Sequence, residues 1–230
     1  MLEVFGEEIW TVEGPTVTGA AGFQYPTRMV IIRLSHGELV VWSPIALTRD
    51  LREVVERLGI VRHLVPPNSL HHVFLGEWQS AFPDAVVYAP PGLPEKRPDI
   101  RFDVDFGEQP IAAWAGEIEH AVIRGNRITT EVALFHRGSR TAVFGDLIQH
   151  LPRGWFRGWR AVVARLDLMT ADAPAVPRKF RAAFRDRRVA RDAISPVLAW
   201  PTDKVIIAHG QPVTANGQAF LHQTFQWLLR

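Results

Sequence analysis

The chain of 230 residues has 26 basic and 24 acidic side chains, a formal net charge of +2, and 47% hydrophobic residues. This composition predicts a single folded domain, residues 1–230, with a sizeable core. The absence of cysteine excludes disulfides, thiolate zinc sites and a cysteine nucleophile, and it suits a reducing, cytoplasmic location. We expect no membrane span and no secretory signal, because no apolar run has the required length or setting. Any metal must therefore bind to histidines and carboxylates.

The first half of the sequence predicts strands separated by turns, and then alternating helices and strands. A hairpin is expected where residues 35–38 join two apolar segments. A helix is expected over residues 48–58, where apolar residues recur at helical spacing and a glycine follows. The expected strands are 2–5, 9–12, 28–34, 39–42, 60–65 and 85–88, with a second helix over 70–82. The resulting β-α-β-α-β order is typical of layered α/β folds.

The second half begins with a loop-rich stretch after residue 90 and continues with further strands. These are expected at 100–106, 111–115, 118–123, 131–136 and 141–144, the last two forming a hairpin. A helix-rich, basic insertion is expected over about 151–198. A buried strand at 204–208 and a helix at 216–229 complete the chain.

The basic insertion has 11 basic and 4 acidic side chains within residues 151–192. Phe180 and Phe184 alternate with arginines at helical spacing, which predicts an amphipathic helix with buried phenylalanines and solvated arginines. We therefore do not expect nucleic-acid binding, although a nucleic-acid or anionic-ligand binder stays open as a third hypothesis. Trp155, Phe156 and Trp159 are expected to pack in the core, with a substrate wall as the alternative.

Three apolar strands are each followed by side chains that can bind a metal ion. His71 and His72 follow the strand 60–65 and a Pro-Asn turn, Asp146 follows 142–145, and His209 follows 205–208. Residues at the carboxyl ends of strands project into the usual active-site crevice of α/β sheets, and imidazole and carboxylate groups bind zinc and iron. The alternatives are structural: helix caps, turns or packing. Glu131 is a lesser candidate, for which a buried structural hydrogen bond is the expected role.

Other classes of site find little support in the sequence. No glycine-rich phosphate loop of the Walker or Rossmann type is present. Ser43 and Ser69 lack the glycine-flanked setting of a nucleophile elbow. An acyl-transferring serine is therefore disfavoured.

The order of these elements resembles the metallo-β-lactamase superfamily over nearly the whole chain. The matching segments are 39–44, 51–58, 64–72, 141–146 and 205–209. Within that superfamily the chain looks most like a bacterial branch with a Pro-Asn-x-x-His-His turn. The resemblance implies a four-layer αβ/βα sandwich and a metal-dependent hydrolase.

The sequence departs from the family's His-x-His-x-Asp-His motif. Pro67 and Ser69 stand where the first two histidines belong, His71 stands at the aspartate and His72 at the last histidine. Ser43 also replaces an aspartate in an early turn, and the middle histidine has no match.

The resemblance therefore implies one metal position and not two. Its members would be His72, Asp146 and His209, with His71 substituting for an aspartate and Glu131 as a further recruit. Asp146 would also be the catalytic carboxylate. One divalent ion is expected, with zinc favoured and iron or manganese as alternatives.

These observations lead to a first hypothesis of a single-metal hydrolase acting on a small-molecule substrate, for which an anion is one option. The second hypothesis is a non-catalytic binding or structural module that retains the fold, because several family positions are lost. The sequence predicts neither the substrate nor the oligomeric state.

Overall fold

Two β-sheets lie face to face in the computed structural model, which describes residues 1–229. The larger sheet contains, in spatial order, β1 (Leu2–Gly6), β2 (Ile9–Thr18), β3 (Gln24–Arg33), β4 (Glu38–Trp42), β5 (Ile60–Val65), β6 (Val86–Ala89) and β7 (Val104–Asp105). The smaller sheet has the order β11 (Lys204–Gly210), β10 (Thr141–His150), β9 (Glu131–His136) and β8 (Ile118–Ile123). Strands β4 to β7 run parallel to one another, as do β10 and β11, whereas the other neighbours are antiparallel.

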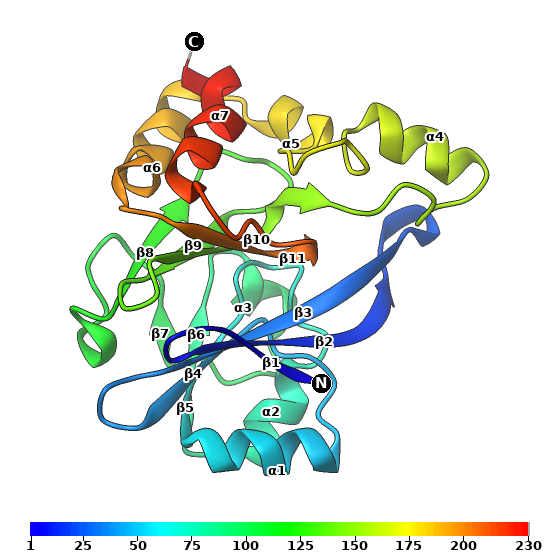
Figure 1. Cartoon of the computed structure of the whole chain (residues 1–230). Coiled ribbons are helices and arrows are strands. Elements are labelled where there is room, and N and C mark those ends of the chain that lie inside the picture. Colours follow the sequence, from blue (N-terminus) through cyan, green and yellow to red (C-terminus); the bar gives the residue numbers. More distant parts are fainter. Residues whose placement is uncertain (230) are drawn as a thin grey trace.

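Helices cover the outer faces of both sheets and give four layers (Figure 1). The larger sheet is covered by α1 (Arg49–Leu58), α2 (Leu75–Ala81) and α3 (Leu93–Lys96), and the smaller by α5 (Arg178–Ala183), α6 (Arg187–Ala199) and α7 (Gly217–Leu229). Helix α4 (Trp159–Leu166) lies to one side and packs against Phe23, next to the start of β3. One apolar cluster fills the space between the two sheets. A second cluster lies between the larger sheet and its helices, and a third lies between the smaller sheet and its helices. The predicted four-layer α/β sandwich is confirmed.

The elements that differ from the sequence prediction are mostly those whose ends depend on tertiary contacts. Strand β2 continues through Gly14-Pro15 to Thr18, with a bulge between Gly14 and Val17. The predicted strand 111–115 is instead a short 3-10 helix, Ala112–Trp114, and the predicted strand 100–106 contracts to β7. The helix predicted over 70–82 is only α2, and α3 was not predicted. Strand β10 does not end at Phe144 but continues to His150.

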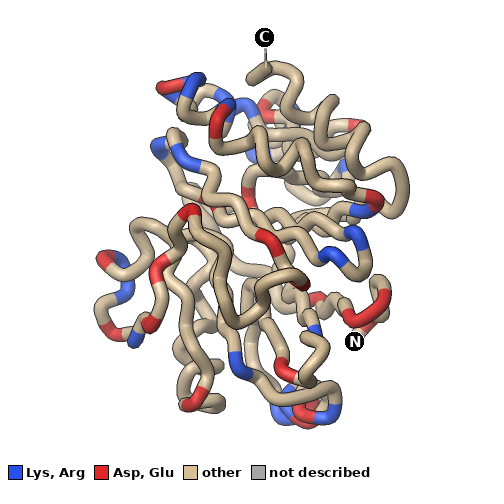
Figure 2. Tube along the Cα trace, turned by 90° about the vertical axis from the view of Figure 1, so that its left-hand side faces the viewer, with Lys and Arg blue, Asp and Glu red and all other residues tan. Residues whose placement is uncertain are grey.

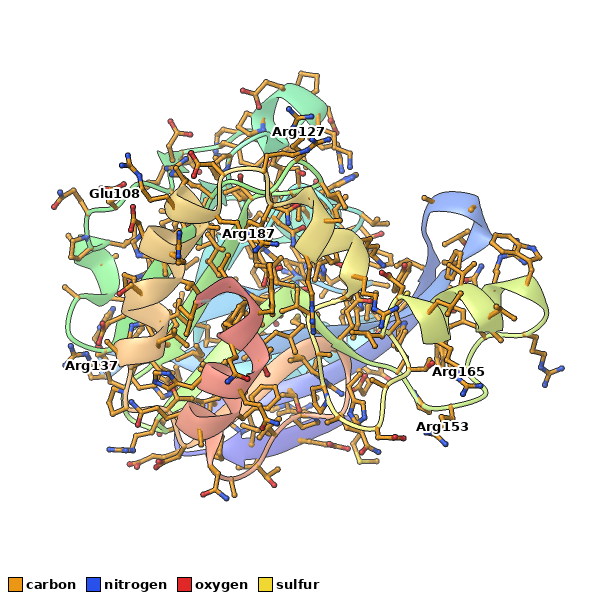
Figure 3. The ribbon with its side chains drawn as sticks, turned by 90° about the horizontal axis from the view of Figure 1, so that it is seen from above. Glu108, Arg127, Arg137, Arg153, Arg165 and Arg187 are labelled. Carbon is orange, nitrogen blue, oxygen red and sulfur yellow. The ribbon has the colours of Figure 1, made fainter. Side chains whose placement is uncertain are left out.

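The basic segment 151–198 forms α4, α5 and most of α6. Phe180 and Phe184 are buried, as the amphipathic pattern predicted, and most of the neighbouring arginines are exposed. Figure 2 shows Lys and Arg interspersed with Asp and Glu along the trace. In Figure 3 the labelled arginines Arg137 and Arg153 lie at opposite sides of the molecule and Arg165 lies on α4. Among residues 1–229, no helix combines the length and the apolar character that a membrane crossing requires.

Candidate metal centre

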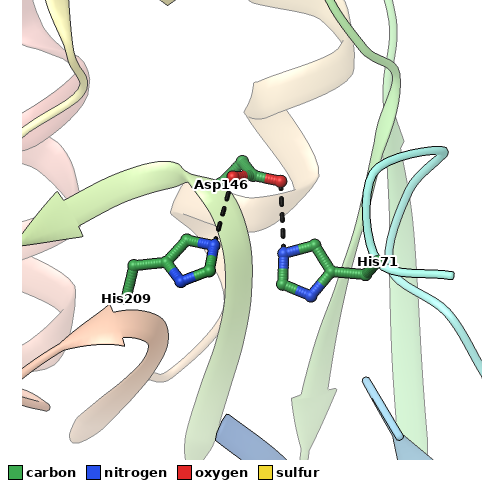
Figure 4. Close-up of side chains that lie close together, drawn as sticks. All are labelled: His71, Asp146 and His209. Atoms are coloured by element: carbon green, nitrogen blue, oxygen red, sulfur yellow. Dashed lines mark ion pairs between the residues drawn. The ribbon is translucent and has the colours of Figure 1, made fainter. Parts of the chain in front are cut away.

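Three side chains from three separate elements converge between the two sheets (Figure 4). His71 comes from the loop after β5, Asp146 from β10, and His209 from β11. His71 Nε2 lies 3.2 Å from Asp146 Oδ2, and His209 Nε2 lies 3.3 Å from Asp146 Oδ1. Two ligand atoms that each lie about 2.0–2.1 Å from a tetrahedral zinc ion are roughly 3.3–3.4 Å apart, and each imidazole nitrogen lies at about this distance from one of the two Asp146 oxygens. All three candidate ligand atoms lie within 4.8 Å of one another.

The tautomer of His209 indicates that a cation or an additional proton lies between His209 and Asp146. His209 Nδ1 lies 2.7 Å from the carbonyl oxygen of Pro26, which can only accept a hydrogen bond, so Nδ1 carries the proton. In the neutral imidazole, Nε2 is then a lone pair, and it faces a carboxylate oxygen of Asp146. Two acceptors at this distance require a cation or an additional proton between them. Metal-binding histidines typically donate their other ring nitrogen to a backbone carbonyl in this way.

The buried negative charge of Asp146 also favours a bound cation. Asp146 is only 6% exposed, and Glu131, behind it, is fully buried. Burial by itself would raise the pKa of Asp146, but the adjacent His71 and His209 outweigh burial and hold that pKa well below its ordinary value. Asp146 is therefore a carboxylate at neutral pH. Buried charges in proteins are paired or coordinate metals, so the donor set fits a divalent cation.

Asn68 fixes the loop that carries His71 and also holds Asp146. Its side-chain oxygen accepts hydrogen bonds from the backbone N–H groups of Leu70 and His71, a local turn typical of asparagine. Its amide nitrogen donates to Asp146 Oδ2 at 3.0 Å and to Glu131 Oε2 at 3.4 Å. Asn68 is completely buried. It therefore aligns two of the three candidate ligands, a role that the sequence analysis missed.

Ser43 orients the His71 ring from the other side. Its Oγ lies 2.8 Å from His71 Nδ1, which leaves Nε2 free to face Asp146. Ser43 is buried and has a left-handed backbone with φ of 51°, at the turn that follows β4. The serine found where the resemblance expected an aspartate thus still contacts the centre, through a candidate ligand.

Glu131 supports the backbone around Asp146 and is not positioned as a ligand. Its two oxygens accept hydrogen bonds from the backbone N–H groups of Gly145, Asp146 and Leu147, at 2.6–3.0 Å. These residues form a bulge in β10, because Phe144 pairs with Ile207 whereas the next pair is Gln149 with His209. Burial, followed by the charge of Asp146, raises the pKa of Glu131 to about 7, although the three backbone hydrogen bonds lower it.

Gly145 is required by the close approach of neighbouring groups at this bulge. A Cβ atom there would lie 3.1 Å from Glu131 Oε2, 3.2 Å from Asn68 Nδ2 and 3.3 Å from Pro67 Cβ. In the Gly-Asp pair singled out in the sequence, Gly145 therefore allows the backbone to pack tightly, and this packing positions the carboxylate of Asp146.

His72 lines the same cavity but is not one of the three converging side chains. Its Nδ1 lies 3.0 Å from Arg97 Nη1, and Arg97 also donates to the His72 carbonyl oxygen. Burial, with further contributions from Lys96 and Arg97, lowers the pKa of His72, so the ring is neutral. Of the two adjacent histidines, the structure thus brings His71 and not His72 to Asp146 and His209.

Arg28 anchors the end of β11 that carries His209, a second contribution that the sequence analysis missed. Arg28 is buried, pairs with Glu13, and donates to the carbonyl oxygens of Ile207 and Gly210. Gly210 has φ of 133°, and a Cβ atom there would lie within 1.9 Å of the His150 carbonyl oxygen. The backbone on both sides of His209 is therefore fixed.

A cavity of about 660 Å³ opens over the centre and includes all three converging residues in its lining. This volume is within the range of small-molecule sites. Tyr25 also lines it, and its ring centroid lies 5.2 Å from that of His209. Burial, assisted by the charges of Asp146 and Asp167, raises the pKa of Tyr25 to about 12. The Tyr25 hydroxyl therefore stays protonated at neutral pH, so Tyr25 is a hydrogen-bond donor among the residues that line the cavity.

Comparison with protein families assigns the chain. Residues 6–156, more than half of the chain, match the family model described as Domain of unknown function (DUF4336). The chain belongs to this family. The DUF4336 match ends at residue 156, so it includes His71 and Asp146, whereas His209 lies beyond it. No match is found among curated proteins.

Solved structures show what this DUF4336 chain resembles in three dimensions. A metallo-beta-lactamase from Pontibacter korlensis has a TM-score of 0.63 and 16% sequence identity, over 100% of this chain and 99% of that one. The metallo-beta-lactamase FIM-1 from Pseudomonas aeruginosa, in its mono-zinc form, gives 0.64 and 10%, over 99% and 95%. The Flv1 flavodiiron core from Synechocystis sp. PCC6803 gives 0.66 and 11%, over 100% of this chain but 60% of that one. These likenesses show the metallo-β-lactamase fold, which confirms the resemblance drawn from the sequence at the level of fold.

Proposed function

We propose that the chain is a metal-dependent hydrolase whose single divalent ion is held by His71, Asp146 and His209. Zinc is the favoured ion, with iron or manganese as alternatives, because two imidazoles and one carboxylate suit all three. The observation that carries the proposal is the His209 Nδ1–H bond to Pro26, which turns Nε2 towards a buried carboxylate. Two proteins of similar fold, one in a mono-zinc form and one a flavodiiron core, support a metal-binding role for the fold.

An ion bound here would act as a Lewis acid that activates water and polarises a substrate carbonyl or phosphoryl oxygen. The residues of the chain supply the remaining functions. His71, Asp146 and His209 would hold the ion on one side and leave the cavity side open. Asp146 would also be the catalytic carboxylate, because it stays ionised and would accept a hydrogen bond from a water molecule and orient it. Tyr25 would donate a hydrogen bond to a substrate oxygen, and its high pKa keeps that donor in place.

The test is hydrolysis by tag-free protein of three chromogenic substrates: a p-nitrophenyl ester, a thioester and bis-p-nitrophenyl phosphate. We expect turnover of at least one, its loss on chelation and its recovery on addition of zinc. Asp146→Ala and His209→Ala should each lower turnover by at least about 100-fold, because losing a residue beyond the ligands already costs 10- to 100-fold. His222→Ala is the matched control, since His222 is exposed on α7.

Metal-loaded protein that hydrolyses none of the three substrate classes would overturn the proposal. The chain would then be a non-catalytic binding or structural module that retains the fold. The proposal includes a cytoplasmic location, which the lack of cysteine supports because it suits a reducing compartment.

A further inference from the structure

The cavity over the candidate metal centre has an apolar wall on the side of His209. Phe23 and Met169 belong to a buried cluster at the base of α4, and Phe180 from α5 and Val163 from α4 complete this wall. Tyr25 connects the wall to the centre, because it packs against the same cluster and against the His209 ring. An apolar group of a bound molecule would be removed from water here.

The apolar character continues at the rim of the cavity. Val163 is 41% exposed, and three further rim residues are between 40% and 55% exposed: Leu70, Val73 and Ile128. Exposed apolar residues scattered singly need no explanation, but these converge on one opening. The entrance therefore also favours an apolar molecule.

The part of the lining formed by α3 and the loop of Ser69 and His72 presents a positive charge. Lys96, at the end of α3, lines the cavity, and its ammonium group donates to the Ser69 carbonyl oxygen at 2.8 Å. Within residues 1–229, no carboxylate forms an ion pair with Lys96. Two of the three hydrogens of its ammonium group are thus left for another acceptor.

The second lysine of the cavity does not supply a free charge. Lys179 Nζ lies 3.2 Å from Asp167 Oδ2, and it also lies over the Tyr25 and Phe180 rings at 5.8 and 5.3 Å from their centroids. Lys179 is thus neutralised by its neighbour and contributes its aliphatic stem to the apolar wall. This difference leaves Lys96 as the cation available to a bound molecule.

We infer that the cavity takes an amphiphilic anion, whose apolar chain lies against the α4–α5 wall and whose carboxylate or phosphate group meets Lys96. This inference rests on the proposed function in one respect: the hydrolysed bond would lie between the two ends, over His71, Asp146 and His209. The substrate class is then an ester, thioester or phosphodiester that joins an acyl or alkyl chain to an acidic group. Binding of the two ends depends on the chain's own residues and not on a metal.

The experiment measures binding of simple amphiphiles to chelated protein by titration calorimetry. The probes are ethyl, butyl, hexyl and octyl phosphate, with octanoate and octanol for comparison. Chelation prevents the phosphate from binding to a metal, so the phosphate contact reports on the protein alone. We expect the affinity to rise about three- to fourfold for each added methylene, because each buried methylene contributes a constant increment.

Two variants separate the two ends of the molecule. Lys96→Gln should lower the affinity for octyl phosphate about tenfold and leave that for octanol unchanged, since a charge-assisted contact is lost. Arg49→Gln, which removes one exposed positive charge on α1, is the matched control and should change neither affinity. Val163→Asn should weaken octyl phosphate and octanol alike, by about three- to tenfold. Octanoate binding as tight as octyl phosphate would identify the acidic group as a carboxylate, and weaker binding would identify it as a phosphate.

Affinity that does not depend on chain length, or that Lys96→Gln leaves unchanged, would overturn the inference. Metal-dependent hydrolysis of short, soluble esters without amphiphile binding would overturn it too, while leaving the hydrolase proposal intact. The opposite result is also distinguishable. If binding depends on chain length and on Lys96 but the protein hydrolyses none of the substrates, the binding inference is confirmed and the hydrolase proposal is wrong.

Discussion

Replacing Asn68 by aspartate should destabilise the metal-free protein more than replacing it by alanine. The amide nitrogen of Asn68 donates to Asp146 Oδ2 at 3.0 Å and to Glu131 Oε2, and the side chain is completely buried. Alanine removes a 3.0 Å hydrogen bond to a buried carboxylate, worth about 1.5–3 kcal/mol, and a longer 3.4 Å contact worth about 0.5–1 kcal/mol, or about 2–4 kcal/mol in all. Aspartate keeps the size and the oxygen that holds the loop, but it adds a third buried carboxylate in contact with two others. We expect a cost of about 3–6 kcal/mol for aspartate, because a buried charge without a partner is strongly destabilising.

Urea denaturation in the presence of a chelator, followed by circular dichroism, measures both variants against the unsubstituted chain. The comparison is sensitive because these costs are a large fraction of the free energy of unfolding of a typical domain, about 5–15 kcal/mol. An aspartate variant as stable as the alanine variant, or more stable, would refute the reasoning. It would mean that the Asn68 amide does not face buried carboxylates in the metal-free protein.

Three other predictions use stability as the measurement. Gly145→Ala should cost about 1–3 kcal/mol in urea denaturation, because the added methyl group meets tightly packed atoms; an unchanged midpoint would contradict this. Burial lowers the pKa of His63, so the stability that the neutral ring contributes is present above pH 6.5 and is lost as the pH falls towards the folded-state pKa. The difference in stability between the unsubstituted chain and His63→Gln should therefore shrink below pH 6.5. A difference that stays constant with pH would contradict this prediction. Phe156→Ala should lower stability by about 3–5 kcal/mol in thermal unfolding, whereas Trp159→Ala, 55% exposed, should cost less than about 1 kcal/mol, and equal losses would contradict the packing described.

The fold could be predicted because its signals are local. Apolar strands, the Thr48 cap and the glycine after α1 mark element ends within a few residues. Errors arose where an element depends on a partner far along the chain. The apolar stretch 100–106 keeps only Val104–Asp105 as strand, because only these residues pair with β6. Strand β10 passes its Gly-Asp pair because Glu131 stabilises a bulge there, which no local pattern indicates.

The site could be predicted only in part, because some of its residues are placed by local strand signals and others by contacts between distant residues. Asp146 and His209 come after the apolar segments 142–145 and 205–208, which lie in the neighbouring parallel strands β10 and β11, so both side chains reach the same edge of the sheet. The choice between His71 and His72 depends on the Asn68 turn and on Arg97, and adjacent histidines look alike in a sequence. The Pro-Asn turn itself was visible, but the contact of its amide with Asp146 was not. Arg28 carried no signal beyond its place in a predicted strand, and Ser43 carried none beyond its position at the aspartate of the family's early turn.

Metal content per chain, measured by elemental analysis on tag-free protein purified without chelators, shows whether His71, Asp146 and His209 hold an ion. We expect one equivalent of zinc, iron or manganese per chain, its loss in His71→Ala and in His209→Ala, and its retention in His72→Ala, because His72 faces Arg97. Protein that contains no metal and takes up none when it is added would contradict the account. So would a His72→Ala variant that loses its metal as completely as His71→Ala.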